Sequence, residues 1–167
     1  PNGSGKSTLL ELVVGSLDFK QGEIKLLGQS IENFDAWDKI SYISQKVKEF
    51  NNSFPATAKE IIGSMLYQEM GFFKLLTSKL ESRIDEVLQL VDMLDYKDSL
   101  IGEMSGGQQQ RIFIARALIT NPKVIFLDEP LVGVDAKAQE KFYRLLAKLN
   151  QELGITIIMI SHNLNLI

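Results

Sequence analysis

The chain has 167 residues, which is about the size of one domain and enough to enclose a hydrophobic core. Hydrophobic residues make up 45% of it and charged residues 23%, a balance typical of a globular protein. Its apolar runs are far shorter than the roughly 20 residues that a membrane span needs, and we expect no signal peptide. The absence of cysteine excludes disulfides and thiolate metal sites, and the net charge of −3 argues against a general nucleic-acid binder.

The first part of the chain is predicted to form a helix and two strands. An apolar stretch after a glycine-rich start predicts a helix from residue 6 to about residue 17. A short strand is expected over residues 22–28, where glycines bound an apolar run. Apolar and polar residues alternate over residues 40–44, which predicts a half-buried strand that runs into Gln45.

The middle of the chain changes to a helical pattern, from residue 58 to about residue 104. Apolar side chains recur here at spacings of three and four, which places them on one face of a helix: Leu80, Ile84, Val87, Leu88, Val91 and Leu94. This block is therefore predicted to be a helical insertion between two parts that contain strands.

The last part alternates helix and strand again. A helix is expected over residues 108–120, a strand buried on both faces over 124–127, an amphipathic helix over 136–153 and a second buried strand over 156–160. This order predicts an α/β fold with a mostly parallel sheet and a right-handed crossover.

The chain opens with a segment that matches the end of the phosphate-loop pattern G-x-x-x-x-G-K-[ST], without its first glycine: Asn2, Gly3, Ser4, Gly5, Lys6, Ser7 and Thr8. Glycines let backbone N–H groups converge on a phosphate, and the helix that follows adds its positive end. Lys6 would reach the β- and γ-phosphates, and the Ser7 hydroxyl would bind Mg²⁺. The alternative is a flexible polar terminus that matches by chance.

Two carboxylates, Asp128 and Glu129, follow the strand predicted at 124–127. They should lie at the carboxyl edge of the sheet, where ligands of such folds bind. Asp128 suits a partner of Mg²⁺, and Glu129 is placed to orient or deprotonate a water that attacks a phosphate. The alternative is that both residues only cap the turn before Pro130.

Three further features are ambiguous when each is taken alone. Ser105, followed by Gly106 and Gly107, suits an anion site at the start of a helix, although this tripeptide precedes many helices. One nucleotide cannot easily contact both this site and the phosphate loop of the same chain, so a second chain is implied. His162, the single histidine, and Gln45 each end a predicted strand, but either could be structural.

These motifs, in this order, resemble the ATP-binding subunit of ABC transporters over essentially the whole chain. The phosphate loop corresponds to Walker A, Gln45 to the Q-loop, residues 104–108 to the signature motif, 124–129 to Walker B, 133–135 to the D-loop and His162 to the switch histidine. Met104 stands where leucine is commoner in the signature motif, and Asn163 stands where many relatives have aspartate.

The resemblance implies a P-loop NTPase core at residues 1–52 and 105–167, interrupted by an ABC-type helical subdomain at 53–104. It also implies two subunits paired head to tail, with ATP and Mg²⁺ between them. The nucleotide would lie between residues 2–8 of one chain and Ser105, Gly106 and Gly107 of the other. Gln108 and Asp135 would also bind it. Ser7, Gln45 and Asp128 would hold Mg²⁺. Glu129 would be the general base, His162 would contact the γ-phosphate, and Gln45 would reach Mg²⁺ or the attacking water.

The family further implies a peripheral protein at the cytoplasmic face of the membrane, docked on permease subunits by its helical block. Residues 40–46, 52–57 and 133–135 together are similar to the zinc and manganese uptake branch, and 54–57 favour zinc. An extracytoplasmic metal-binding protein would then be an indirect partner, and nucleic acid would not be one. With one histidine and no cysteine, the chain would power metal transport without binding the transported metal.

Other readings stay open. The first strands of the family fold, with an aromatic residue that stacks on adenine, are absent, and the chain ends soon after His162, so we expect a fragment of a longer subunit. The subunit could serve another ABC importer, such as one for iron chelates, or be a soluble ABC-type ATPase acting on DNA ends or ribosomes. DNA-repair relatives need a long coiled coil, for which residues 6–105 leave no room. A module without catalysis is disfavoured because Lys6, Asp128, Glu129 and His162 are all present.

Overall fold

The computed structural model describes residues 4–18, 20–44, 55–71 and 76–161. Its helices and strands follow one another as α1 (Lys6–Val13), β1 (Lys25–Leu26), β2 (Gln29–Ser30), β3 (Ile40–Ile43), α2 (Ala58–Gly63), α3 (Ser78–Leu90), α4 (Gly106–Leu118), β4 (Val124–Asp128), α5 (Ala136–Leu153) and β5 (Thr156–Ile160). Short 3₁₀ turns lie between them at Ile31–Asn33, Trp37–Lys39, Ser64–Leu66, Leu94–Tyr96 and Ile101–Glu103.

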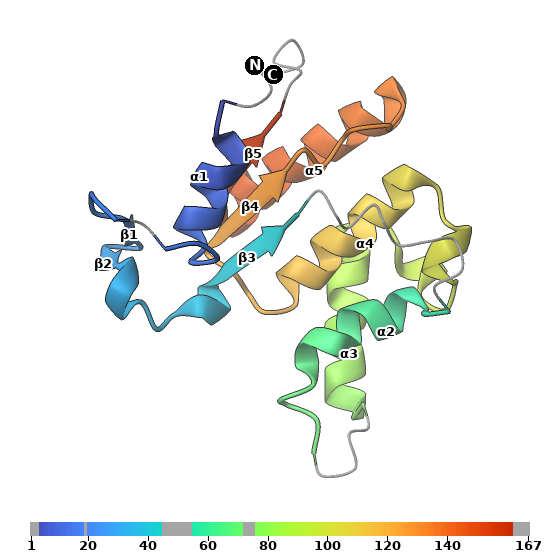
Figure 1. The fold of residues 1–167 in the computed structure, drawn as a ribbon. Coiled ribbons are helices and arrows are strands. Elements are labelled where there is room, and N and C mark those ends of the chain that lie inside the picture. Colours follow the sequence, from blue (N-terminus) through green and yellow to red (C-terminus); the bar gives the residue numbers. More distant parts are fainter. Residues whose placement is uncertain (1–3, 19, 45–54, 72–75, 162–167) are drawn as a thin grey trace.

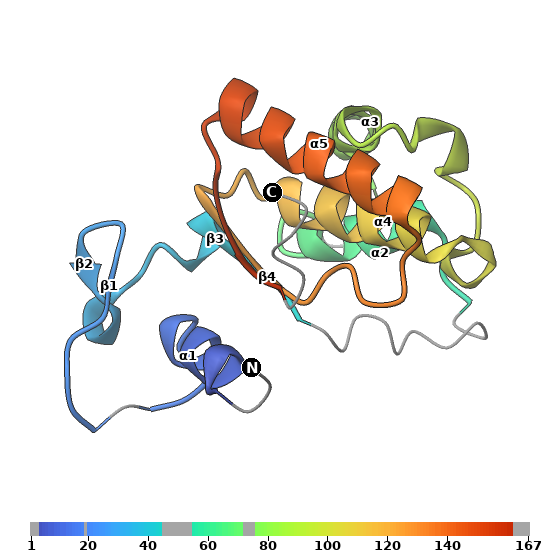
Figure 2. The same cartoon turned by 90° about the horizontal axis from the view of Figure 1, so that it is seen from above.

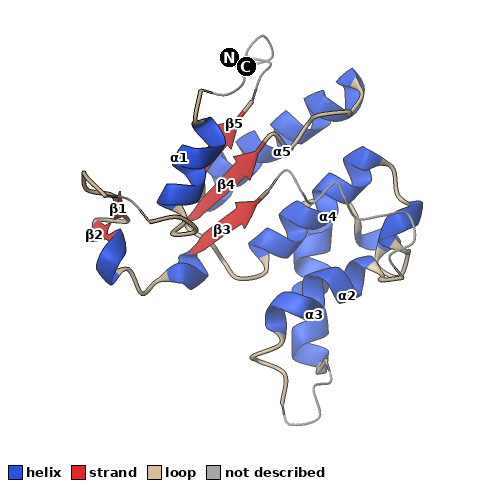
Figure 3. Cartoon of the chain, in the orientation of Figure 1, coloured by secondary structure: helices blue, strands red, loops and turns tan. Residues whose placement is uncertain are grey.

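The central sheet of the described chain has the strand order β3-β4-β5, and both pairs of neighbours are parallel (Figures 1 and 3). Ile43 pairs with Leu127 and Asp128 with Ile160, so the carboxyl ends of all three strands meet at one edge. Parallel strands need long crossovers, which here are the helical segments between β3 and β4 and the single helix α5 between β4 and β5. The α/β class and the parallel sheet expected from the sequence are confirmed.

Strand β4 is buried along its whole length, and its alternate side chains feed two separate cores. Val124 and Phe126 pack with Leu10 of α1, whereas Ile125 and Leu127 join the core formed by α4, α5 and the helical block. Figure 2 shows the corresponding layers, with α1 on one face of the sheet and α4 and α5 on the other. This alternation decides which face each residue at the strand's end can reach.

The helical block between β3 and β4 packs α2 and α3 against α4. Thr57 caps α2 through a capping box with Glu60, and Thr77 caps α3 by accepting the N–H of Leu80. Most of the predicted apolar face is buried, since Ile84 and Leu88 are each 0% exposed, but α3 ends at Leu90, and Leu94 in the following 3₁₀ turn is 41% exposed. The block thus buries its apolar face on the same helix that begins at Ser105.

Two predicted elements near the N-terminus are shorter than expected. Helix α1 stops at Val13, because Gly15 takes a φ of 72° and lies against the Trp37 ring. The strand expected over 22–28 is only the two-residue β1, which pairs antiparallel with β2. Leu27 and Gly28 both have positive φ, 48° and 87°, as a tight two-residue hairpin turn requires.

Candidate active site

The phosphate-loop segment leads directly into α1. Gly5, the residue before the helix, has a φ of 81°, and no side chain caps the helix start. Gly5 therefore places no capping side chain over the first-turn N–H groups, an arrangement that suits a phosphate oxygen. Lys6 Nζ donates to Ser4 Oγ at 3.1 Å, which keeps the lysine head beside the loop.

Ser7 and Asp128, which are 121 residues apart in the chain, are in contact. Ser7 Oγ donates to Asp128 Oδ1 at 3.4 Å. The contact follows from the packing, since Leu10 docks α1 on the face of β4 to which Phe126 points. Asp128 has the same position in the strand's alternation as Phe126 and therefore faces α1 as well. A hydroxyl and a carboxylate are the hard oxygen ligands that Mg²⁺ prefers, so these residues fit the metal predicted here.

The surroundings of Asp128 carry negative charge within a largely buried site. Asp128 is only 5% exposed. On the neighbouring strand, the pKa of Tyr42 is raised above its ordinary value, first by burial of the phenol and then by the charges of Asp128 and Glu11. The Tyr42 phenol thus stays protonated and neutral. The negative charges that raise its pKa also favour a cation at the end of β4.

Glu129 has an unusual backbone that joins it to the end of β5. Its φ is 47°, in the left-handed region that few residues other than glycine adopt. Its N–H donates to the carbonyl of Ile160 at 3.0 Å. Glu129 and Ser161 line one cavity of about 340 Å³, which opens at the carboxyl edge of the sheet. Glu129 therefore lies beside the strand that leads to His162.

Ser105 begins α4 on the opposite face of the sheet from α1. Ser105 Oγ accepts the N–H of Gln108 at 3.4 Å, and the Ser105 N–H donates to Gln108 Oε1 at 2.9 Å, which completes a capping box. Asp135 is likewise a helix cap, since its Oδ1 accepts the Ala138 N–H at 3.0 Å at the start of α5. A Cβ added to Gly107 would lie 3.1 Å from Ala138 Cβ, so the two helix starts are tightly packed.

The structure therefore brings together part of the predicted site. Ser7, Asp128 and Glu129 share one edge of the sheet, with Ser4, Gly5, Lys6 and Thr8 at the adjoining start of α1. Residues 105–108 lie on the other face, apart from this group (Figure 2). Four further predicted site residues lie outside the described ranges: Asn2, Gly3, Gln45 and His162.

Sequence reasoning missed Gln110, which links α4 to the loop after Glu129. Its Nε2 donates to the carbonyl of Pro130, and its Oε1 is buried and accepts no hydrogen bond within the described chain. The signal was present in the sequence, because three consecutive glutamines begin a helix that is otherwise apolar almost all round. Any of these amides that is buried needs a hydrogen-bond partner, but the sequence does not tell which of them is buried.

Among the residues that the structure describes, no helix has the length and apolar character that crossing a membrane requires. Two solved structures share the fold. A component of the cbiONQ ABC transporter complex of Clostridium perfringens aligns with a TM-score of 0.84 at 28% identity, covering 100% of this chain and 66% of that one. A dimeric ATP-binding cassette bound to ADP and Pi aligns with a TM-score of 0.78 at 28% identity, covering 99% and 73%.

Named relatives match nearly the whole chain. The zinc uptake system ATP-binding protein ZurA of Listeria monocytogenes is 49% identical over 98% of this chain, which spans 64% of that relative's length. The high-affinity zinc uptake system ATP-binding protein ZnuC of Bacillus subtilis is 34% identical over 99% of this chain and 71% of its own length. The family model for ABC transporters matches residues 1–132, and the chain therefore belongs to the ABC transporter family, among its ATP-binding proteins.

Proposed function

We propose that this chain is part of the subunit that binds and hydrolyses ATP to power an ABC importer for a divalent metal, with zinc as the favoured ion. The observation that carries the proposal is the contact of Ser7 Oγ with the buried Asp128 carboxylate. This contact supports the proposal because a hydroxyl and a carboxylate are ligands that Mg²⁺ prefers, and Glu129 is the next residue after Asp128.

Each residue at this edge has a proposed part in phosphoryl transfer. The N–H groups of the first turn of α1 and the Lys6 ammonium bind and orient the β- and γ-phosphates. Ser7 and Asp128 would hold Mg²⁺, which when bound neutralises charge on those phosphates. Glu129 orients a water and accepts its proton as the water attacks the γ-phosphate. His162 and Gln45 are proposed to contact the γ-phosphate and the attacking water, respectively.

A second chain would complete the site. Because α4 starts on the opposite face of the sheet from α1, residues 105–108 are proposed to contact the nucleotide held by a partner's phosphate loop. Head-to-tail pairing would then enclose two nucleotides and exclude water. The helical block, residues 53–104, is proposed to dock on permease subunits at the cytoplasmic face of the membrane.

The transported ion is inferred from the relatives. Those at 49% and 34% identity are named as zinc uptake ATP-binding proteins, while a Synechocystis relative at 38% is named for manganese transport. We therefore favour zinc over manganese, with an extracytoplasmic metal-binding protein as an indirect partner. The alternative is an ATPase subunit for another substrate, such as an iron chelate.

The test uses the full-length subunit. Glu129→Gln should abolish steady-state ATP hydrolysis while ATP binding and ATP-dependent pairing persist, because the substitution removes the base and keeps the shape. A deletion strain should fail to grow when metals are chelated and should recover with zinc but not with manganese. Hydrolysis at the wild-type rate by Glu129→Gln contradicts the catalytic assignment, whereas recovery with manganese alone contradicts only the choice of ion.

A further inference from the structure

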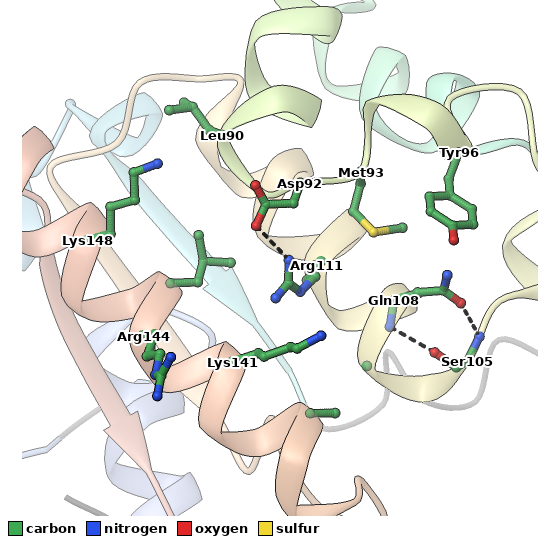
Figure 4. A pocket seen from close by; sticks show the side chains of 13 residues that line it. Leu90, Asp92, Met93, Tyr96, Ser105, Gln108, Arg111, Lys141, Arg144 and Lys148 are labelled. Atoms are coloured by element: carbon green, nitrogen blue, oxygen red, sulfur yellow. Dashed lines mark hydrogen bonds and ion pairs between the residues drawn. The ribbon is translucent and has the colours of Figure 1, made fainter.

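A cavity of about 650 Å³ lies between the starts of α4 and α5 and the segment that follows α3 (Figure 4). Ser105 and Gln108 form one end of it, and the apolar side chains of Met93, Tyr96 and Leu145 form part of its wall. Asp128 and Glu129, at the carboxyl edge of the sheet, do not line it.

The charged lining of this cavity is strongly unbalanced. Four cationic side chains and one anionic side chain line it: Arg111, Lys141, Arg144, Lys148 and Asp92. Asp92 is engaged by Arg111 at 3.1 Å, and Arg144 is paired with Glu140, outside the lining, at 2.6 Å. Among the residues that the structure describes, Lys141 and Lys148 form no ion pair or hydrogen bond. An excess of positive charge is therefore left facing the cavity.

Arg111 is held in place while keeping donors for a ligand. Its side chain is only 16% exposed, and its Nη1 donates to both the Val91 carbonyl and the Asp92 carboxylate. Within the described ranges, Nη2 and Nε make no hydrogen bond. Figure 4 shows Lys141 reaching from α5 toward α4, on the side where Arg111 and Gln108 lie. Two like charges on facing helices repel one another unless an anion lies between them.

The spacing of the cations selects an extended anion. Lys141 and Lys148 lie seven residues apart on α5, which is roughly 10 Å along the helix axis. A single phosphate cannot contact both without bending the lysines toward each other, but a chain of phosphates can. We propose that this cavity is a binding site for a polyphosphate group, held by Arg111, Lys141 and Lys148. The group could come from a free polyphosphate or from a phospholipid headgroup that carries two phosphates.

The test measures binding of inorganic tripolyphosphate to the full-length subunit by titration calorimetry. All proteins carry Lys6→Ala, which removes the phosphate-loop lysine, so that the effect of the α5 lysines, which are outside the proposed ATPase site, reports on the cavity. Lys141→Ala combined with Lys148→Ala should weaken binding about tenfold, and added salt should weaken the unaltered cavity further. Both lysines are exposed and make no described contact, so the fold should survive their removal.

The matched control is Lys79→Ala combined with Lys137→Ala, which removes the same charge from exposed positions outside the cavity. This control should bind tripolyphosphate within about twofold of its parent. Equal weakening in both double variants, or no binding by the parent, overturns the proposal. When tripolyphosphate does bind, vesicles of cardiolipin, whose headgroup carries two phosphates, identify the source. Retention on them through Lys141 and Lys148 points to a headgroup, and no retention points to a free polyphosphate.

Discussion

Glu129 combines a proposed catalytic side chain with a strained backbone. Its φ of 47° places the carboxylate on a path that a normal strand residue could not follow, just after Asp128 has pointed toward α1. For residues with a Cβ this conformation is less stable by about 1–2 kcal/mol, and glycine is free of that penalty. The strained backbone at Glu129 therefore turns its carboxylate in a different direction from the carboxylate of Asp128.

This strain predicts an unusual order of stability. Glu129→Ala and Glu129→Gly both remove the carboxylate, but only glycine relieves the backbone, so we expect the glycine variant to be more stable by about 1 kcal/mol. Urea unfolding of the two proteins measures the difference, and neither should hydrolyse ATP. A more stable alanine variant would mean that the left-handed backbone is not retained in solution.

Tyr42 provides a test of the charge at Asp128. Because its pKa is raised, the folded protein keeps a proton that the unfolded chain releases above the ordinary value of 10.0. The free energy of unfolding should therefore fall as pH rises from about 9 to 11, and Tyr42→Phe should show a smaller fall. With a metal chelator present, Asp128→Asn should reduce the difference in pH dependence between proteins with and without Tyr42→Phe. Some difference should remain, since burial raises the pKa of Tyr42 more than the charge of Asp128 does. Identical pH profiles for wild type and Tyr42→Phe would contradict this.

At the scale of elements, the contact between the starts of α4 and α5 explains Gly107, the second of the two glycines after Ser105. A Cβ on Gly107 would crowd Ala138 Cβ at 3.1 Å, whereas a Cβ on Gly106 would meet Val134 Cγ2 at an ordinary 3.9 Å. Gly107 is thus required for close approach of two helices, and Gly106 is not required for that reason.

The two glycines form a matched pair for a stability measurement. Gly107→Ala should lower the free energy of unfolding by about 1–3 kcal/mol through overpacking, offset in part by the helix preference of alanine. Gly106→Ala should be neutral or stabilising by up to about 1 kcal/mol, because alanine favours the helix and meets no obstacle. Equal changes in the free energy of unfolding for the two variants, measured by thermal or denaturant unfolding, would show that α4 and α5 can move apart without loss of stability.

The sequence predicted the bounds of those elements that begin and end at capping residues. Helix α5 spans the residues expected, because Asp135 caps its start and Gly154, with a φ of 64°, ends it. The hairpin between β1 and β2 was not predicted, since Leu27 adopts a positive φ that its residue type disfavours. The contact between Ser7 and Asp128 could be expected, because ligands of such folds bind at the carboxyl ends of the strands, where Asp128 lies. The burial of Gln110 depends on tertiary packing, which the periodicity of the sequence does not reveal.

At the scale of the whole molecule, the sheet separates two sets of proposed nucleotide-binding residues. Helix α1, with Lys6 and Ser7, covers one face, while α4, which starts after Ser105, covers the other (Figure 2). A nucleotide bound at α1 cannot also contact the start of α4 in the same chain without passing through the packed core around β4. This geometry favours composite sites shared between two chains.

Composite sites predict that two defective chains can rescue each other. Lys6→Ala and Ser105→Arg, each placed in a Glu129→Gln background of the full-length subunit, should both fail to pair in ATP as judged by gel filtration. In a mixed pair, one interface combines both defects, but the other joins an unaltered Lys6 to an unaltered Ser105. An equal mixture should therefore recover ATP-dependent pairing and trap about one nucleotide per mixed pair, against about two in the parent. If each chain instead formed its site alone, both sites of every mixed pair would carry a defect, and the mixture would trap no more ATP than either variant by itself.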